Sequence, residues 1–286
     1  MLLAKSDTSR YFSNATDSRK FKLECRTPTN DWLELTRLIR GKYIDEMIIL
    51  EGVLKESNNV VIKIGRTDIL TKEYDIGKQL QYFPNFIRYY CNFNCLDTRD
   101  NLESLVNGHL KRVCTDDGTI NIGVLVMPYY ILGDIESYVW REQDLGILKN
   151  VLKQICFGLM YAYEKIGFLH NDEHLGNILL RITNKKSLQY GDLELPLEDL
   201  YAVITDFEKS TIGTSGDVFS SIRRLIHLVS TSEKSDMALD YEDAKLMRLR
   251  NSDTVIKKKD YITVNNVIDN MTIRYVKSKR PKMKLW

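Results

Sequence analysis

The sequence predicts an α+β, bilobal fold, in which a β-rich lobe with one main helix precedes a mainly helical lobe. Short runs rich in β-branched residues, "EMIILEGVL" (46–54) and "VVIKI" (60–64), occur in the first half of the chain. The second half contains segments with apolar residues at helical spacing, beginning with "LGILKNVLKQICFGLMYAYEKIGF" (145–168). The expected parts are a loosely ordered N-terminal arm (1–30), a first lobe (31–127) and a second lobe with a basic tail (128–286).

The first lobe is expected to contain a hairpin followed by a helix. The cluster "KESNN" (55–59) favours a turn, so the runs 46–54 and 60–64 are expected to pair with each other. Apolar residues near helical spacing predict a helix over "TKEYDIGKQLQYF" (71–83).

Further strands and helices follow along the chain. Two strands are predicted at "FIRYYCNFN" (86–94) and "INIGVLVMPYY" (120–130), and the polar stretch between them (96–118) predicts an irregular insertion. In the second lobe, residues 187–210 predict short strands, and "DVFSSIRRLIHLV" (217–229) predicts another apolar helix.

The composition is that of an ordinary globular protein. The 286 residues are 43% hydrophobic and 28% charged, which argues against bulk disorder. A net charge of +2 predicts no global attraction to polyanions. No apolar run reaches the roughly 18 residues that a membrane span needs, so none is expected. The start, "MLLAKSDTSR", lacks a signal-peptide pattern, and we therefore expect an intracellular, cytoplasmic location.

The basic tail and the cysteines each leave a simple expectation. The Lys and Arg cluster in "RYVKSKRPKMKLW" (274–286) suits an acidic partner, and the alternative is a solvated basic end. The five cysteines are odd in number and scattered, which argues against a disulfide framework. "CNFNC" (91–95) lacks a second Cys or His pair at zinc-like spacing, so we expect five reduced thiols.

Five polar positions occur in an order that suits phosphoryl transfer. Lys63 lies within an apolar strand, where a lone charge is costly, and Glu73 on the next helix can pair with it. Asp172 and Asn177 follow the long helix, and Asp206 ends the apolar run "YAVITDF". Phosphoryl transfer needs cations, ligands for Mg²⁺ and a base that orients the nucleophile, and hard oxygen ligands suit Mg²⁺.

These motifs resemble those of the protein-kinase-like superfamily. "VVIKI" resembles the strand with the phosphate-binding Lys, and "HNDEHLGN" (170–177) matches the catalytic-loop pattern H-x-D-x-x-x-x-N. "DFE" (206–208) resembles the metal-binding D-F-G, and "VLVMPYYILGDI" is similar to the hinge, with Met127 at the gatekeeper position. The resemblance covers about residues 40–230 and implies a protein-kinase-like fold that binds ATP with Mg²⁺.

The resemblance also implies a role for each residue. The adenine of ATP would lie between the lobes against the hinge, which includes Met127 and Tyr129. Lys63, held by Glu73, would contact the α- and β-phosphates. Asn177 and Asp206 would hold Mg²⁺. The carboxylate of Asp172 would accept or orient the proton of the acceptor hydroxyl.

Several positions depart from the usual protein-kinase pattern. The glycine-rich loop is reduced to Gly41 and Gly52. Asn171 replaces the Arg that usually receives an activation-loop phosphate, and His174 stands where protein kinases usually have a Lys that helps to neutralise the transferred phosphate. Glu208 replaces the last Gly of D-F-G.

The segment after "DFE" bears on the acceptor. Only about ten residues separate it from Asp217, which resembles the acid that braces the catalytic loop, and no A-P-E motif occurs there. The peptide-docking platform is therefore expected to be truncated.

Three functions are consistent with this pattern. The first is a serine/threonine protein kinase acting on protein hydroxyl groups, and the motifs are most similar to compact kinase-like proteins encoded by large DNA viruses, which would place it in the host cytoplasm. The second is a small-molecule kinase, since "HND" and "DFE" also resemble choline, ethanolamine and aminoglycoside kinases. The third is a catalytically silent scaffold with a kinase-like fold.

Overall fold

The computed structural model of the chain describes residues 32–274, apart from 42–46, 55–57, 110–111, 214, 232–237 and 250–255. The described residues have an α+β architecture and form two compact units. The first unit contains the described residues up to Gln79 together with Arg88–Tyr129. The second contains Leu80–Ile87 and the described residues from Tyr130 onward. The expected N-terminal arm (1–30) and residues 275–286 of the basic tail lie outside the described residues.

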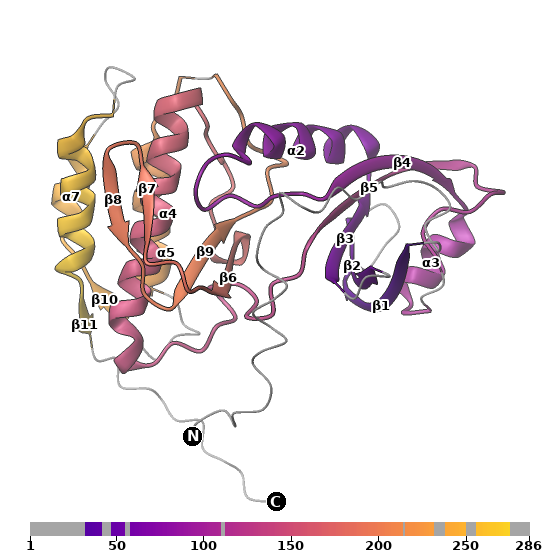
Figure 1. The fold of residues 1–286 in the computed structure, drawn as a ribbon, viewed down its shortest axis with the longest axis horizontal. Coiled ribbons are helices and arrows are strands. Elements are labelled where there is room, and N and C mark those ends of the chain that lie inside the picture. The colour runs from indigo at the N-terminus through magenta and orange to yellow at the C-terminus, as the bar shows by residue number, and fades with distance from the viewer. Residues whose placement is uncertain are drawn as a thin grey trace, which may run out of the picture. The chain divides into compact units, whose positions relative to one another are not determined.

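A five-stranded antiparallel sheet is the framework of the first unit (Figure 1). Its strands are β1 (Leu33–Arg40), β2 (Ile48–Leu54), β3 (Asn59–Gly65), β4 (Cys91–Asp97) and β5 (Ile120–Pro128). Their order across the sheet is β1-β2-β3-β5-β4. The predicted hairpin is confirmed, because β2 pairs with β3 and Ile49 lies opposite Lys63. Strand β1 is not among the strands predicted from the sequence.

The sheet packs one face of its strands into an apolar core. Residues of β2 alternate between buried and half-buried, the period expected of a strand with one covered face. Leu50 of β2 and Ile62 of β3 belong to the same buried cluster. A Cβ atom at Gly52 would lie 2.8 Å from both the backbone oxygen of Glu34 and the Cδ1 atom of Ile62. Close packing of the strands therefore explains this glycine without a phosphate loop.

The helix predicted at 71–83 is confirmed as α2 (Thr67–Leu80). The strand predicted at 86–94 is only partly correct, because β4 begins at Cys91. Residues Leu80–Ile87, at the start of the predicted strand, belong to the second unit, where the backbone N–H of Ile87 donates to the carbonyl of Ile204 over 3.0 Å.

The insertion between β4 and β5 contains a helix that the sequence analysis missed. This helix, α3 (Arg99–Val106), begins after Thr98, whose hydroxyl accepts a hydrogen bond of 3.1 Å from the backbone N–H of Asn101. Threonine is a favoured N-cap residue because it satisfies a backbone donor that has no partner within the helix.

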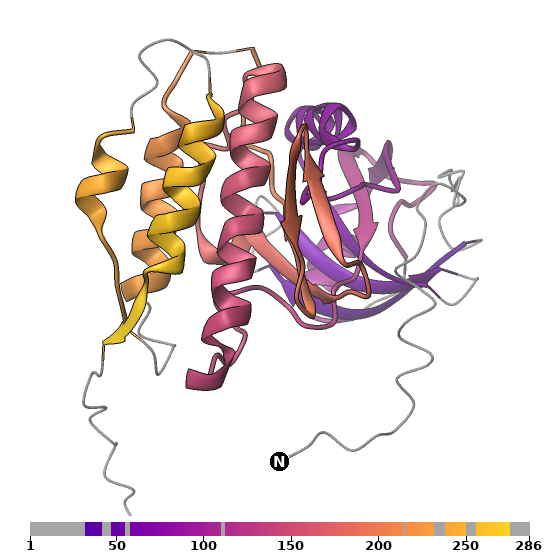
Figure 2. The same ribbon diagram turned by 60° about the vertical axis from the view of Figure 1, so that its left-hand side comes forward.

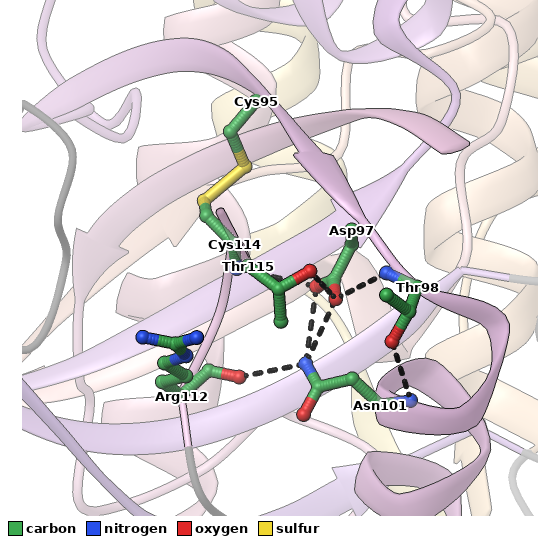
Figure 3. Close-up of a disulfide and its surroundings, with 7 residues drawn as sticks. All are labelled: Cys95, Asp97, Thr98, Asn101, Arg112, Cys114 and Thr115. Carbon is green, nitrogen blue, oxygen red and sulfur yellow. Dashed lines mark hydrogen bonds between the residues drawn. A yellow bond between two sulfur atoms is a disulfide. The ribbon is translucent and has the colours of Figure 1, made fainter. Parts of the chain in front are cut away.

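The expectation of five reduced thiols is wrong. Cys95 on β4 and Cys114 in the insertion form a disulfide across 19 residues of sequence (Figure 3). Cys91 is also disulfide-bonded. Cys156 is a free, buried cysteine, and burial raises the pKa of its thiol to about 12. Spacing along the sequence could not reveal the pair, since disulfide formation depends on the distance between residues in the fold.

The second unit combines helices with short two-stranded sheets (Figure 2). Its helices are α4 (Leu145–Ile166), α5 (Val218–Thr231), α6 (Asp243–Met247) and α7 (Lys258–Asp269), with 3₁₀ turns η2 (Glu142–Asp144) and η3 (Leu175–Asn177). Its strands are β6 (Ile178–Ile182), β7 (Ser187–Tyr190), β8 (Leu193–Pro196), β9 (Leu200–Ile204), β10 (Ala238–Asp240) and β11 (Thr272–Arg274). They pair as β6 with β9, β7 with β8 and β10 with β11.

Helix α4 is the centre of this unit, and it confirms the helix predicted at 145–168. It contacts α5, α7 and β9, and Figure 2 shows it beside α7. The helix ends at Gly167, which has φ of +62° and donates its N–H to the carbonyl of Tyr163 over 2.8 Å. A glycine adopts this left-handed conformation at little cost, so it terminates the helix. Among the described helices, none is both long and apolar enough to cross a bilayer.

A buried polar network attaches the segment Leu80–Ile87 to the rest of the second unit. The side-chain amide of Asn85 donates to the side-chain oxygen of Gln154 at 3.3 Å and to the carbonyl of Ala202 at 2.9 Å. The hydroxyl of Tyr190 donates to the amide oxygen of Asn85. Buried polar groups with several partners favour a single arrangement of the elements that supply them.

Candidate active site

Lys63 and Glu73 form a buried ion pair within the first unit. The Nζ atom of Lys63 lies 2.9 Å from Oε1 and 3.1 Å from Oε2 of Glu73, and the two side chains are 8% and 0% exposed. The hydroxyl of Tyr89 donates to Oε1 of Glu73 over 2.6 Å. Glu73 therefore holds the ammonium of Lys63 at a defined place beside β3, the strand between β2 and β5. The sequence predicted the pairing of Lys63 with Glu73 but not the contact of Tyr89 with Glu73.

The two residues expected to contact adenine lie at the end of β5. Met127 is buried and is opposite Val61 of β3. Tyr129 follows the strand and donates its backbone N–H to the carbonyl of Asn59 over 3.3 Å. The first unit ends at Tyr129.

Asp172 and Asn177 belong to one loop that closes on itself. The side-chain amide of Asn177 donates to the backbone carbonyl of Asp172 over 3.1 Å. Asn177 ends η3 and is directly followed by β6, so the loop continues into a paired strand. This hydrogen bond explains the spacing of five between the two residues, since the turn between them brings the amide back to the carbonyl.

Asp206 lies next to Asn177 because strands β6 and β9 are paired. Ile178 is opposite Ile204, and the backbone N–H of Thr205 donates to the carbonyl of Asn177 over 3.0 Å. Asp206 follows with φ of +68°. A non-glycine residue in the left-handed region is uncommon, and such strain is frequent at functional sites.

Asn177 and Asp206 offer a donor set that fits Mg²⁺. The amide nitrogen of Asn177 is used in the bond to Asp172, which leaves its amide oxygen for a ligand, and Asp206 supplies a carboxylate. Mg²⁺ prefers hard oxygen ligands and is often bound by one or two carboxylates together with substrate phosphates. Within the part of the chain that the structure describes, no group of three or more His, Cys, Asp and Glu side chains forms a metal site.

His170 is a buried, positioning residue of the same loop. It is 2% exposed, and its Nε2 atom lies 2.9 Å from the carbonyl of Thr205, which can only accept a hydrogen bond. Its ring makes edge contacts with Phe168 and Phe207. Burial lowers the pKa of His170 below its ordinary value, which favours the neutral ring. The loop and the "DFE" segment are thereby packed together.

The expectation that Asp217 braces the catalytic loop is wrong. Within the described residues its carboxylate accepts a bond of 3.1 Å from the backbone N–H of Phe219 and pairs with Arg223 at 2.8 Å. Glu173 contacts the loop backbone in its place. It is 6% exposed and accepts a hydrogen bond of 3.1 Å from the N–H of Asn171, and the hydroxyl of Ser221 on α5 donates to the same carboxylate oxygen.

A cation that the sequence analysis did not identify contacts Asp172. The Nζ atom of Lys209 lies 3.0 Å from Oδ1 of Asp172. The hydrogen bond to Asp172, followed by the negative charge of that residue and then of Glu208 and Asp206, raises the pKa of Lys209. The sequence signal was the position of Lys209 directly after "DFE", but nothing in that position alone indicates a contact with the loop 37 residues earlier.

Comparison with known proteins gives a partial match. The chain is similar to the serine/threonine-protein kinase haspin of Mus musculus, with 32% identity over 89 residues, which are 30% of this chain and 12% of that protein. It is also similar to haspin of Bos taurus, with 31% identity over 96 residues, which are 32% of this chain and 12% of that protein. The matched segments thus span about an eighth of each relative. No family model matches the chain. These similarities support a relationship to the protein-kinase-like superfamily.

Proposed function

We propose that this chain is an ATP-dependent phosphotransferase, a serine/threonine protein kinase that transfers the γ-phosphate of ATP to a protein hydroxyl with Mg²⁺. The observation that supports the proposal most directly is the loop that links Asp172 to Asn177, beside the strand end that holds Asp206. These are the residue types that phosphoryl transfer requires, in the order in which protein kinases use them. The partial similarity to haspin favours the same class.

In this proposal each unit supplies part of the chemistry, and the two units correspond to the lobes of a kinase-like fold. Lys63, held by Glu73, contacts the α- and β-phosphates, and Met127 and Tyr129 contact the adenine. Asn177 and Asp206 hold Mg²⁺, which neutralises phosphate charge when it is bound. Asp172 takes the proton of the acceptor hydroxyl, so the oxygen becomes a better nucleophile.

A small-molecule acceptor is the second candidate, and one feature favours it. The residues after "DFE" turn back at once: Leu169 and Thr211 exchange two backbone hydrogen bonds of 2.9 Å, and α5 begins at Val218. Little chain is left there to form a surface on which an extended peptide could dock.

The experiment that tests the proposal is phosphate transfer from labelled ATP by the purified full chain. Generic acceptor proteins are compared with choline, ethanolamine and aminoglycosides, each with and without Mg²⁺. Transfer to protein supports the first candidate, and transfer to a small molecule supports the second. The matched control is Asp206→Asn. Asparagine adopts the left-handed backbone conformation of this position at little cost, and the substitution removes the carboxylate charge.

Nucleotide binding is measured in parallel, because a silent scaffold would also give no transfer. A bound nucleotide raises the apparent melting temperature, by mass action on the folded state. We expect a rise with ATP that is larger with Mg²⁺, and we expect Asp206→Asn to lose the Mg²⁺-dependent part. If the chain transfers no phosphate and its melting temperature does not change at millimolar ATP, the proposal is refuted in favour of a scaffold that does not bind nucleotide.

A further inference from the structure

The ion pair between Lys209 and Asp172 has no clear role in stability. The two side chains are 60% and 27% exposed. Exposed ion pairs contribute little to folding, because water and salt screen the charges and the long side chains lose freedom. Its location is unusual, however, since it places an ammonium 3.0 Å from the carboxylate oxygen of the expected catalytic base.

The backbone holds Lys209 against the loop, so the contact does not depend on the long side chain alone. The side-chain amide of Asn171 donates to the carbonyl of Lys209 over 3.3 Å and to the hydroxyl of Thr211 over 3.3 Å. The hydroxyl of the fully buried Ser210 donates to the carbonyl of His170 over 3.0 Å. These hydrogen bonds fix the backbone of residues 209–211 against residues 170 and 171, which directly precede Asp172.

The loop itself lacks the permanent cation that its pattern leads one to expect. His174 occupies that position, so a histidine ring stands where the pattern has the ammonium of a lysine. Phosphoryl transfer depends on positive groups near the transferred phosphate, where charge is spread over three oxygens in the transition state.

We infer that Lys209 is the cation that contacts the transferred phosphoryl group and replaces the missing lysine of the loop. The inference rests on the proposed function and names a further residue of the same site. The acceptor oxygen bonds to the γ-phosphorus while the bond from that phosphorus to the β–γ bridging oxygen breaks. Asp172 takes the hydroxyl proton, and ADP leaves with the electron pair of the broken bond.

The distances allow Lys209 to reach the reacting atoms. A base lies about 2.6–3.2 Å from the hydroxyl that it deprotonates, and reacting atoms lie about 3–3.5 Å apart. The ammonium of Lys209 already contacts the base, and the base contacts the acceptor hydroxyl. The ammonium can therefore reach the oxygens of the phosphoryl group that this hydroxyl attacks. The flexible stem of a lysine lets it follow the phosphate during transfer.

The test compares Lys209→Met, Lys209→Arg and the wild-type chain. The matched control is Lys165→Met, which removes an exposed lysine whose Nζ atom lies 2.8 Å from a carboxylate oxygen of Glu164 on the same helix, α4. The constants kcat and KM for ATP are measured with the acceptor on which the wild-type chain is active, and melting curves verify folding.

We expect Lys209→Met to lower kcat about 100-fold with little change in KM, because the lost contact acts in the transition state. Lys209→Arg should recover most of the lost kcat, and Lys165→Met should leave both constants unchanged. If Lys209 had a purely structural role, Lys209→Arg would not restore activity through its charge, and the loss in Lys209→Met would not be limited to kcat.

Two results would overturn the inference and can be told apart. If the wild-type chain is active and Lys209→Met turns over at the wild-type rate or faster, Lys209 does not assist transfer, and the proposed function stands. If the wild-type chain binds no nucleotide and transfers no phosphate, both proposals fail together.

Discussion

The buried ion pair between Lys63 and Glu73 is the most consequential single contact for interpreting variants of this chain. Burying two charges is costly, and their mutual attraction offsets that cost only while both are present. Glu73 also accepts the hydrogen bond from Tyr89. Removal of the lysine would therefore leave a carboxylate in the apolar interior without its cation, which is a folding defect as well as a catalytic one.

We predict that Lys63→Met lowers the free energy of unfolding by about 3–5 kcal/mol, the usual cost of breaking a buried ion pair. The double variant Lys63→Met/Glu73→Gln should be more stable than the single variant, because a neutral amide can be buried and its oxygen still accepts from Tyr89. Urea denaturation of the three proteins measures this difference. Equal stability of the single and double variants would contradict it.

This prediction also affects the activity assay. An inactive Lys63→Met variant could be inactive because it is unfolded, so the double variant is the more informative test of phosphate contact. If the double variant is folded and still transfers no phosphate, the loss is due to the missing ammonium.

At the scale of elements, the insertion between β4 and β5 is organised by the Cys95–Cys114 disulfide and by Asp97 (Figure 3). The carboxylate of Asp97 is fully buried and accepts hydrogen bonds from the side-chain amide of Asn101, at 2.9 and 3.2 Å, and from the backbone N–H of Cys114, at 3.2 Å. The hydroxyl of Thr115 donates to it over 3.4 Å. The cross-link and the carboxylate thus hold the same loop against the same strand.

We predict that Cys95→Ser lowers the free energy of unfolding by about 3 kcal/mol, because a cross-link that closes a loop of about 20 residues restricts the unfolded chain. Denaturation with and without reductant measures the effect. Reductant should destabilise the wild-type chain by more than it destabilises the variant, and this comparison also accounts for the disulfide of Cys91. If reductant affects both proteins equally, the Cys95–Cys114 bond does not stabilise the fold.

At the scale of the whole molecule, His170 links stability to pH. Its pKa is lowered in the folded state by burial, whereas in the unfolded chain it is near the ordinary value of about 6.5. Below that pH the unfolded chain binds a proton that the folded chain does not. The contribution of the buried neutral ring is therefore fully present above about pH 6.5 and is lost as the pH falls towards the folded-state pKa.

We predict that His170→Gln makes the free energy of unfolding less dependent on pH between 7 and 5.5. The glutamine keeps an N–H donor for the carbonyl of Thr205 but does not titrate. The change in the free energy of unfolding with pH should be smaller in the variant than in the wild-type chain. The difference is up to about 1.4 kcal/mol per pH unit, the value for one proton. Parallel pH profiles of the two proteins would show that His170 does not contribute.

The sequence alone was sufficient where a structure is specified by neighbouring residues. The hairpin of β2 and β3 follows from two β-rich runs around a turn cluster, and α4 follows from a long apolar stripe that ends at Gly167. The helix α2 was found for the same reason. The five polar positions stay a prediction, which rests on their order along the chain.

Only the tertiary structure decided the features that depend on residues far apart in the chain. These are the Cys95–Cys114 bond, the contact of Lys209 with Asp172, and the replacement of Asp217 by Glu173 as the acid that contacts the loop. A hydrogen bond or ion pair requires atoms within about 3 Å, and sequence spacing does not determine that distance once the chain has turned back on itself. Local patterns therefore predicted the elements and named most of the candidate residues, and the packing of those elements selected the partners.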